Sequence, residues 1–212
     1  MTYDAILFDL DGTLVDTINL YKRACIQAIE HGGLKFSEQD FDRLYPMGTS
    51  FNEWILRVGG TEKQVPALRT KRDDAYCELL RQHTVFYAGA TELLRSIQDR
   101  PSAIVTGSWK RYVDAIDELL DVTAHVDRLV TADDLGDFHK PHPHGLLLAA
   151  DSLQVEPSRC LYVGDQMFDV GAAKAAGMTS CCIVTGHTPK QAIAEADFVV
   201  RSLPELHQRL SA

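Results

Sequence analysis

Tyr3-Asp-Ala-Ile-Leu-Phe-Asp-Leu-Asp-Gly-Thr-Leu-Val-Asp16 contains a short apolar run that leads directly into a cluster of carboxylates. Residues 5–8 are apolar at every position, which is typical of a central parallel strand covered by helices on both faces. Similar short runs recur along the chain at 102–106, 128–131, 160–164, 180–184 and 197–200. Segments of helix or loop length separate them, so we expect an α/β fold: a Rossmann-like parallel sheet flanked by helices.

The region from residue 16 to residue 83 lacks such strand-like runs. Its apolar residues recur at helical spacing instead, beginning with Ile18, Tyr21, Cys25 and Ile29. We therefore expect residues 16–83 to form a small all-helical cap domain, inserted after the first strand. Residues 1–15 and 84–212 would form the Rossmann-like catalytic core. A helical block at this place is well suited to act as a lid.

Two helix starts can be read from polar residues. Ser37 is followed three residues later by Asp40, which resembles a capping box. Ser108 stands before a segment with apolar residues at helical spacing, and we expect it to cap that helix.

Composition and charge exclude several classes of protein. Of the 212 residues, 45% are hydrophobic and 24% are charged, the balance of a globular protein. The apolar stretches are shorter than the roughly 18 residues that span a bilayer, and no export signal is visible. A net charge of -9 argues against nucleic acid or an anionic membrane as a partner. The five cysteines form no C-x-x-C pair, so we expect a reducing, cytoplasmic location.

Polar residues gather where the predicted strands end. The four clusters are Asp9–Asp16, Thr106–Ser108, His139–Pro141 and Gly164–Asp169. Ligands of a parallel sheet bind beyond the carboxyl ends of its strands, so these clusters are expected to converge. Asp9 and Asp11 would repel each other unless a cation or a proton lies between them. Lys140 would supply a fixed positive charge beside them.

Each cluster also has a purely structural interpretation. Asp165 alone could serve only as a turn former, and Thr106 could satisfy a backbone group at the sheet edge. A single lysine such as Lys140 is ordinarily a solvated surface residue. The histidines of this region resemble a metal-binding run, but their spacing suits a surface loop better: His139, His142 and His144.

The motifs resemble those of a known superfamily. DLDGTLVDT (9–17), VTGS (105–108), HKPHP (139–143) and VGDQMFDVGAAKAAGM (163–178) stand in the order of the four motifs of the haloacid dehalogenase-like hydrolases. The helical stretch after the first motif looks like the cap of the branch that contains phosphoglycolate phosphatase and β-phosphoglucomutase. The resemblance covers the whole chain.

This resemblance implies a magnesium-dependent phosphatase that acts on a small phosphorylated metabolite. Asp9 would be the nucleophile that forms an aspartyl-phosphate, and Asp11 the general acid and base. The implied catalytic set is Asp9, Asp11, Thr106 and Lys140. The transferring phosphoryl group would be bound by Thr106, Gly107, Ser108 and Lys140.

The same resemblance implies Mg²⁺ as the cofactor. Its ligands would be a side-chain oxygen of Asp9, the main-chain carbonyl of Asp11 and the carboxylate of Asp165. Asp169 would bind through water or support the other ligands.

Other activities occur within the same superfamily. A phosphomutase of the β-phosphoglucomutase type is the alternative, but Gly48-Thr-Ser-Phe-Asn-Glu-Trp54 lacks the arginine expected there. Dehalogenases lack the second aspartate of the first motif, which is Asp11 here. The sequence leaves open which metabolite is the substrate, and whether the protein is a monomer or a homodimer.

Overall fold

The computed structural model describes residues 2–211, and its larger sheet has six strands. Their order is β5-β4-β1-β6-β7-β8, and every neighbouring pair is parallel. The strands are β1 (Ala5–Phe8), β4 (Ser102–Val105), β5 (Arg128–Val130), β6 (Cys160–Gly164), β7 (Thr179–Ile183) and β8 (Phe198–Val200). The predicted helix-flanked parallel sheet is confirmed.

Strand β1 lies inside the sheet and all four of its residues are fully buried. It pairs with β4 on one side and β6 on the other, so that Phe8 faces Ile104 and Val163 across the two ladders. The chain completes β4 and β5 on one side before it crosses to β6, and the strand order therefore reverses at β1. In open α/β sheets, ligands bind at the carboxyl end of such a reversal.

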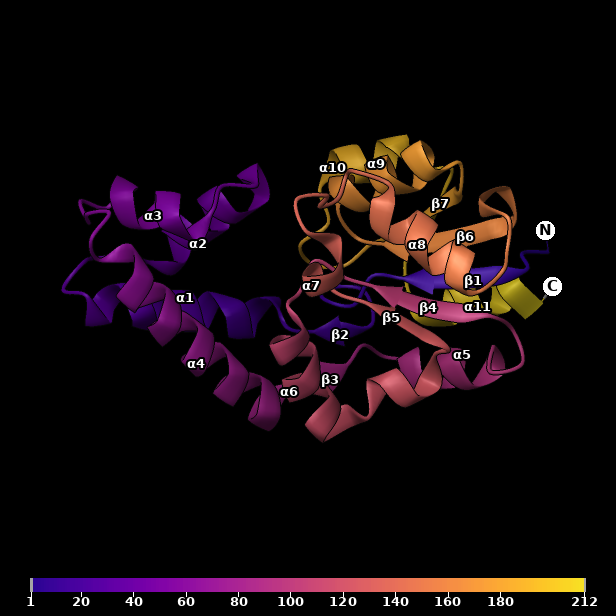
Figure 1. Ribbon diagram of the computed structural model, residues 1–212, viewed down its shortest axis with the longest axis horizontal. Helices are drawn as coiled ribbons and strands as arrows, with labels where there is room; N and C mark the ends of the chain where they lie inside the picture. The colour runs from indigo at the N-terminus through magenta and orange to yellow at the C-terminus, as the bar shows by residue number, and fades with distance from the viewer. Residues whose placement is uncertain (1, 212) are drawn as a thin grey trace. The chain divides into compact units, whose positions relative to one another are not determined.

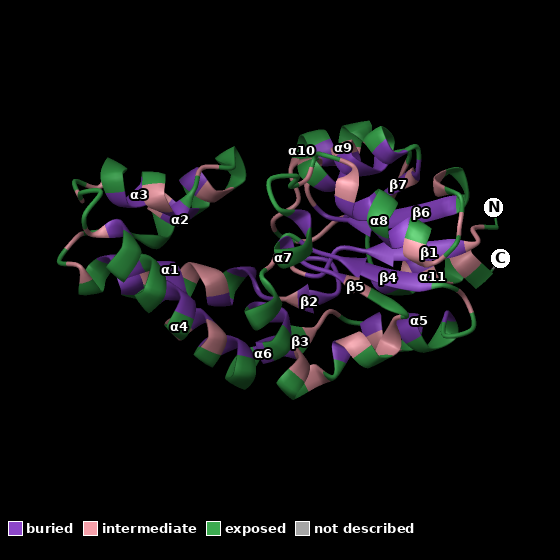
Figure 2. Ribbon diagram, viewed as in Figure 1, coloured by how far each residue is buried: buried purple, intermediate pink, exposed green. Residues whose placement is uncertain are grey.

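Helices cover both faces of this sheet (Figure 1). One face carries α8 (His144–Ser152), α9 (Met167–Ala176) and α10 (Lys190–Glu195), and the other carries α5 (Ala90–Ser96) and α11 (Leu203–Ser211). Figure 2 shows that the inner strands β1, β4 and β6 are buried, whereas the edge strand β5 is partly exposed. The remaining segments here are α6 (Lys110–Leu120), η2 (Val122–His125), α7 (Ala132–Leu135) and η3 (Pro157–Arg159).

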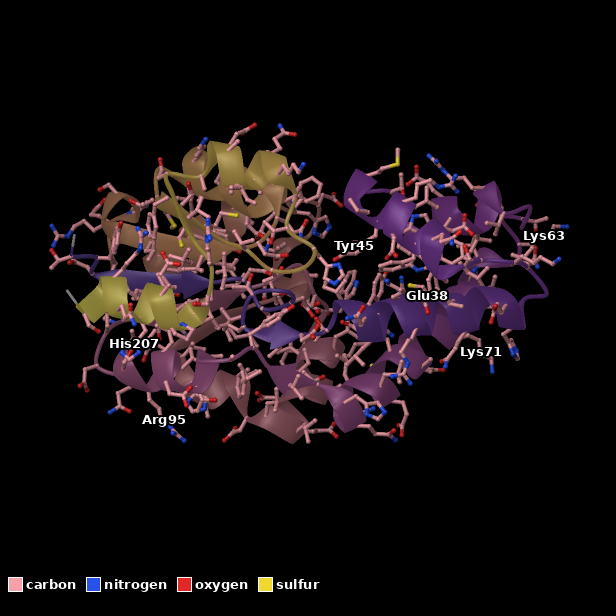
Figure 3. All side chains as sticks on the ribbon, turned by 180° about the vertical axis from the view of Figure 1, so that it is seen from behind. Glu38, Tyr45, Lys63, Lys71, Arg95 and His207 are labelled. Carbon is pink, nitrogen blue, oxygen red and sulfur yellow. The ribbon has the colours of Figure 1, made fainter. Side chains whose placement is uncertain are left out.

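Residues 17–84 form a second compact unit, separate from the unit of residues 1–16 and 85–212. It contains α1 (Ile18–His31), α2 (Glu38–Leu44), η1 (Tyr45–Met47), α3 (Phe51–Arg57) and α4 (Val65–His83). Phe41, Trp54 and Ile55 are buried in a core of its own. Charged side chains such as Lys63 and Lys71 project from its surface (Figure 3). No helix among residues 2–211 is long and apolar enough to cross a membrane.

Two short strands mark the places where the chain leaves and re-enters the sheet unit. Strand β2 (Val15–Asp16) pairs antiparallel with β3 (Val85–Phe86). The sequence predicts neither strand, because two residues are too few to show a periodicity.

The two expected helix starts have different outcomes. Ser37 and Asp40 form the complete capping box at the start of α2, as expected. The prediction for Ser108 is wrong: α6 begins at Lys110 with Trp109 as its N-cap residue. The hydroxyl of Ser108 instead donates a hydrogen bond to Asp11 Oδ2 at 2.7 Å. Ser108 therefore bonds to a side chain distant in sequence and does not cap the helix.

Candidate functional site

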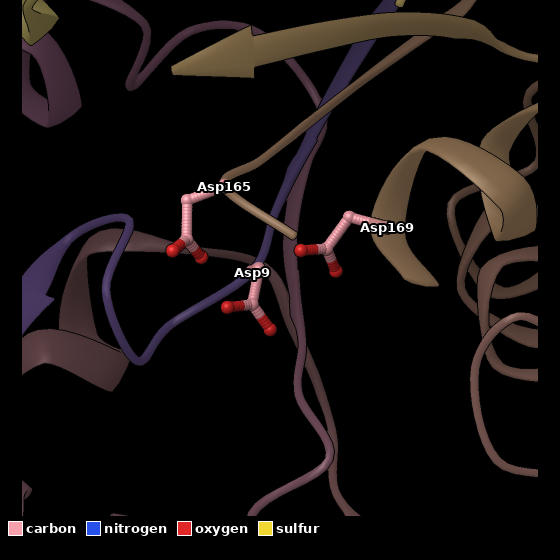
Figure 4. A group of neighbouring side chains, drawn as sticks. All are labelled: Asp9, Asp165 and Asp169. Carbon is pink, nitrogen blue, oxygen red and sulfur yellow. The ribbon is translucent and has the colours of Figure 1, made fainter. Parts of the chain in front are cut away.

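Three buried carboxylates meet at the carboxyl end of the central strands (Figure 4). Asp9 directly follows β1, and its backbone N–H donates to Val163 O at 2.8 Å, which extends the ladder by one residue. Asp165 directly follows β6, and Asp169 lies in the first turn of α9. One oxygen from each of the three carboxylates lies within 4.8 Å of the others.

The turn after β1 packs tightly against Asp165. Gly12 has a φ of +82°, and a Cβ atom at this position would lie 2.9 Å from Asp165 Oδ2. Thr13 Oγ1 donates a hydrogen bond to Asp165 Oδ1 at 3.4 Å. Glycine is required here both for its positive φ and for its missing side chain.

Lys140 supplies the positive charge of the cluster. Its Nζ lies 2.6 Å from Asp9 Oδ1 and 2.6 Å from Asp169 Oδ1. Its side chain is only 12% exposed, so it is not the solvated surface lysine of the structural interpretation. Burial alone would lower the pKa of Lys140, but Asp169 and Asp9 outweigh this effect and raise it well above its usual value. The lysine therefore stays charged.

Burial dominates the ionisation of the carboxylates. It raises the pKa of Asp9 well above the usual value, and Lys140 offsets this only in part. Burial, together with the charge of Asp169, raises the pKa of Asp165 to about 7. For both Asp9 and Asp165, burial therefore disfavours the ionised form more than Lys140 favours it.

Asp11 lies beside the second cluster of the sequence. Asp11 Oδ2 accepts hydrogen bonds from Ser108 Oγ at 2.7 Å and from Thr106 Oγ1 at 3.3 Å. Thr106 Oγ1 in turn accepts the backbone N–H of Ser108 at 3.0 Å. Gly107 between them is exposed, and a Cβ atom there would meet nothing within 4 Å. The structure thus brings Thr106 and Ser108 to Asp11, while the carboxylate of Asp11 lies outside the group of three.

Two residues of the site are absent from the sequence-based prediction. Gln166 donates its side-chain Nε2–H to Asp165 Oδ2 at 2.5 Å and its backbone N–H to Asp169 Oδ2 at 2.9 Å. Its position before α9 and its spacing from Asp169 are the signal of a capping box, which could have revealed it. Tyr162 contacts Lys140 from within β6. No signal marks it, because an aromatic residue in a buried strand is indistinguishable from ordinary core.

The histidines after α7 lie at or near the surface, as their structural interpretation predicts. His139 and His142 are exposed and His144 is half-buried. The rings of His142 and His144 lie 4.7 Å and 5.2 Å from the ring of Phe138. Among residues 2–211, the metal-ligating side chains that converge are the three aspartates, without a histidine.

The donor set of the three aspartates fits a hard divalent cation. Three carboxylates against one ammonium leave a formal charge of -2 when all groups are ionised. Carboxylate oxygens are the ligands that Mg²⁺ prefers. Both oxygens of Asp169 accept hydrogen bonds, from Lys140 Nζ and from the N–H of Gln166. Both oxygens of Asp165 do so as well, from Thr13 Oγ1 and Gln166 Nε2, so hydrogen bonding alone does not decide which of the two would bind the cation directly.

Comparison with known proteins places these residues in a family context. The sequence profile of the haloacid dehalogenase-like hydrolases matches residues 6–183. The chain is 32% identical to phosphoglycolate phosphatase from Escherichia coli K12 over 230 residues, covering 95% of this chain and 90% of that protein. It is 29% identical over 178 residues to fructose-1-phosphate phosphatase YqaB of the same organism, covering 83% of this chain and 94% of the relative.

A solved structure shows the same fold. It is that of a predicted phosphoglycolate phosphatase from Haemophilus somnus 129PT, with a TM-score of 0.87 at 20% identity. The match covers 100% of this chain and 99% of that one.

Proposed function

Because the chain belongs to the haloacid dehalogenase-like hydrolase family, we propose that it is a magnesium-dependent phosphatase of small phosphorylated metabolites. One observation carries the proposal. Asp9, at the end of the central strand, lies 2.6 Å from the buried ammonium of Lys140 and within 4.8 Å of two further carboxylates. A buried carboxylate with a fixed cation and a cation-binding group beside it suits the nucleophile of phosphoryl transfer.

In the first half of the proposed reaction, a carboxylate oxygen of Asp9 attacks the phosphorus of a phosphate monoester. The bond from phosphorus to the ester oxygen breaks, and Asp9 becomes an aspartyl-phosphate. Asp11 donates its proton to the departing alkoxide. The hydroxyl groups of Ser108 and Thr106 hold Asp11 Oδ2 at 2.7 Å and 3.3 Å, which fixes the acid toward the leaving group.

In the second half, a water molecule attacks the phosphorus of the aspartyl-phosphate. Asp11, now ionised, takes the proton of that water, and the carboxylate of Asp9 is restored as inorganic phosphate leaves. The two halves together therefore return Asp9 and Asp11 to their starting states. Mg²⁺ held by Asp9 and Asp165 would neutralise charge on the phosphoryl oxygens.

The loop after β4 is suited to hold the phosphoryl group. It leads into α6, a helix of 11 residues whose N-terminus favours an anion. Gly107 leaves open space at this loop, since no atom lies within 4 Å of where its side chain would begin. Lys140 would counter the repulsion between Asp9 and the incoming phosphate.

Substrate specificity depends on how the protein recognises the part of the metabolite beyond the phosphate. The chain is similarly related to a phosphoglycolate phosphatase and a fructose-1-phosphate phosphatase, at 32% and 29% identity. Family membership therefore does not decide between a phosphorylated acid and a sugar phosphate. We propose that residues 17–84 act as the cap and select the substrate.

The test is phosphate release from a panel of phosphorylated acids, sugars and nucleotides, with Mg²⁺ and with EDTA. We expect Mg²⁺-dependent release by the wild type and a loss of about a thousandfold or more in Asp9→Asn, which keeps the size of the side chain. Asp4→Asn is the matched control, because Asp4 is an exposed partner of Arg159 outside the site. Equal activity of Asp9→Asn and Asp4→Asn would refute the assignment of Asp9 as the nucleophile.

The phosphomutase alternative gives a different product. A mutase would transfer the phosphoryl group to a sugar hydroxyl and release little inorganic phosphate. Gly48-Thr-Ser-Phe-Asn-Glu-Trp54 has no arginine to hold a second phosphate, so we expect hydrolysis to dominate. Incubation with β-glucose 1-phosphate, with separate measurement of phosphate and of glucose 6-phosphate, distinguishes the two reactions.

A further inference from the structure

Tyr162 is a buried tyrosine that touches the charged cluster without belonging to it. It lies in β6, three residues before Asp165, and is 1% exposed. Its hydroxyl lies 2.9 Å from Lys140 Nζ, 3.0 Å from Val105 O and 3.2 Å from Asp169 Oδ1. A phenol ring placed only to fill the core would not need its oxygen at this position.

The protons of Lys140 can be assigned to acceptors. The ammonium has three N–H groups, and its three shortest contacts are Asp9 Oδ1, Asp169 Oδ1 and the Tyr162 hydroxyl, at 2.6, 2.6 and 2.9 Å. The backbone carbonyl of Val105 is farther away, at 3.4 Å. The phenol oxygen therefore accepts a hydrogen bond from the third N–H, and each of the two carboxylates accepts one from the remaining N–H groups.

The phenol is itself held by the sheet. Since its oxygen accepts from Lys140, its own proton must go to another acceptor, and Val105 O is the nearest at 3.0 Å. Val105 is the last residue of β4, directly before Thr106. Through this chain of two hydrogen bonds, the main chain of β4 fixes where the ammonium lies relative to Asp9.

We propose that Tyr162 is a positioning residue, whose hydroxyl holds the Lys140 ammonium against Asp9 for the transfer of the phosphoryl group. This inference rests on the proposed phosphatase function for its kinetic consequence. Without the hydroxyl, the third N–H would have only Val105 O at 3.4 Å, and the ammonium could shift between the two carboxylates. Charge stabilisation in the transition state depends on such preorganised placement.

Tyr162→Phe tests the proposal, because it keeps the buried ring and removes only the oxygen. Tyr112→Phe is the matched control: Tyr112 is 5% exposed, and its hydroxyl accepts a hydrogen bond from Arg111 at 3.2 Å. We expect Tyr162→Phe to lower kcat about tenfold or more, with KM changed less than about threefold. Tyr112→Phe should stay within about twofold of wild type in both constants. Equal effects of the two variants would overturn the proposal.

A double-mutant cycle shows whether Tyr162 acts through Lys140. In a Lys140→Met background the phenol has no ammonium to place, so Tyr162→Phe should lower kcat by less than about twofold. A full tenfold effect in that background would contradict a positioning role. Thermal unfolding of each variant separates these effects from a loss of folded protein.

A spectroscopic measurement decides the proposal independently of activity. In ¹H–¹⁵N spectra of lysine ammonium groups, the Lys140 signal is assigned by its absence in Lys140→Met. We expect its exchange with water to accelerate about tenfold in Tyr162→Phe and not in Tyr112→Phe. Unchanged exchange would overturn the role of Tyr162 even if the protein is a phosphatase. A wild type that releases no phosphate from any ester would refute the proposed function, while this measurement still decides the role of Tyr162.

Discussion

The residues of the site carry more negative than positive formal charge, which favours the binding of a cation. Asp9, Asp165 and Asp169 are nearly inaccessible, and Lys140 is the ammonium that directly contacts two of them. Removing carboxylates from water is costly unless charges are paired. The raised pKa values of Asp9 and Asp165 express this cost. A bound divalent cation would lower both.

Magnesium affinity should therefore depend on pH through Asp165. Burial raises its pKa to about 7, so the carboxyl holds a proton below that pH and must lose it before it binds a metal. We expect the apparent Kd for Mg²⁺ to rise by about tenfold or more per pH unit as pH falls below about 7, because Asp9, whose pKa is also raised by burial, must lose its proton as well. Calorimetric titration with Mg²⁺ from pH 5.5 to 8.5 measures this. An affinity that is the same at pH 6 and pH 8 would argue against Asp165 as a ligand.

The glycine of the first turn offers a second test at this scale. Gly12→Ala must adopt a φ of +82° and place its Cβ 2.9 Å from Asp165 Oδ2, whereas Gly177→Ala adopts a φ of +73° with nothing within 4 Å. We expect both variants to lose about 1 kcal/mol of unfolding free energy from the backbone conformation. Only Gly12→Ala should also weaken Mg²⁺ binding, since it displaces Asp165. Chemical denaturation and Mg²⁺ titration of the pair measure the two effects separately. Equal Mg²⁺ affinity in both variants would show that the close approach has no consequence for the site.

At the scale of helices and strands, the sequence predicts those elements whose pattern is local. The apolar run of β1, the recurring runs of the other strands and the capping box at Ser37 are all visible as short patterns, and each is found. Strands β2 and β3 are stabilised by pairing with each other, so neither shows a pattern alone. The contacts of Ser108 and Tyr162 are not predicted from the sequence for the same reason. Their partners Asp11 and Lys140 are distant in sequence, and only the folded sheet brings them together.

Helix α4 contains a buried ion pair that stabilises the helical unit. Arg72 and Asp73 have side chains only 8% and 7% exposed, and Arg72 Nη1 also donates to Tyr21 on α1 at 3.0 Å. Asp73→Asn would remove the carboxylate charge that contacts the buried guanidinium, and we expect a loss of about 3 kcal/mol or more in unfolding free energy. Arg72→Met with Asp73→Asn should recover part of that loss, because both charges of the pair are then removed. Urea denaturation followed by circular dichroism measures both. A double variant less stable than Asp73→Asn alone would contradict this account of the pair.

At the scale of the whole molecule, the site is a product of topology. Residues 9, 106, 140 and 165 are far apart in the chain, and parallel strands bring their carboxyl ends to one edge of the sheet. This convergence can be predicted from the sequence once the strands are recognised. The choice of substrate cannot, since it depends on side chains outside the motifs.

The packing of both units can be tested together through the five cysteines. Cys25, Cys160, Cys181 and Cys182 are buried, and burial raises the pKa of Cys25 to about 12 and of Cys160 to about 11. Cys77, on α4, is only half-buried. Because the thiolate is the reactive form, we expect a thiol reagent at pH 8 to label Cys77 rapidly in the folded protein and the four others only after denaturation. Cys77→Ser should abolish the rapid phase, and mass spectrometry of the peptides identifies the site. Rapid labelling of Cys25 in the folded protein would contradict the close packing of the helical unit, and rapid labelling of Cys160, Cys181 or Cys182 would contradict that of the core around the sheet.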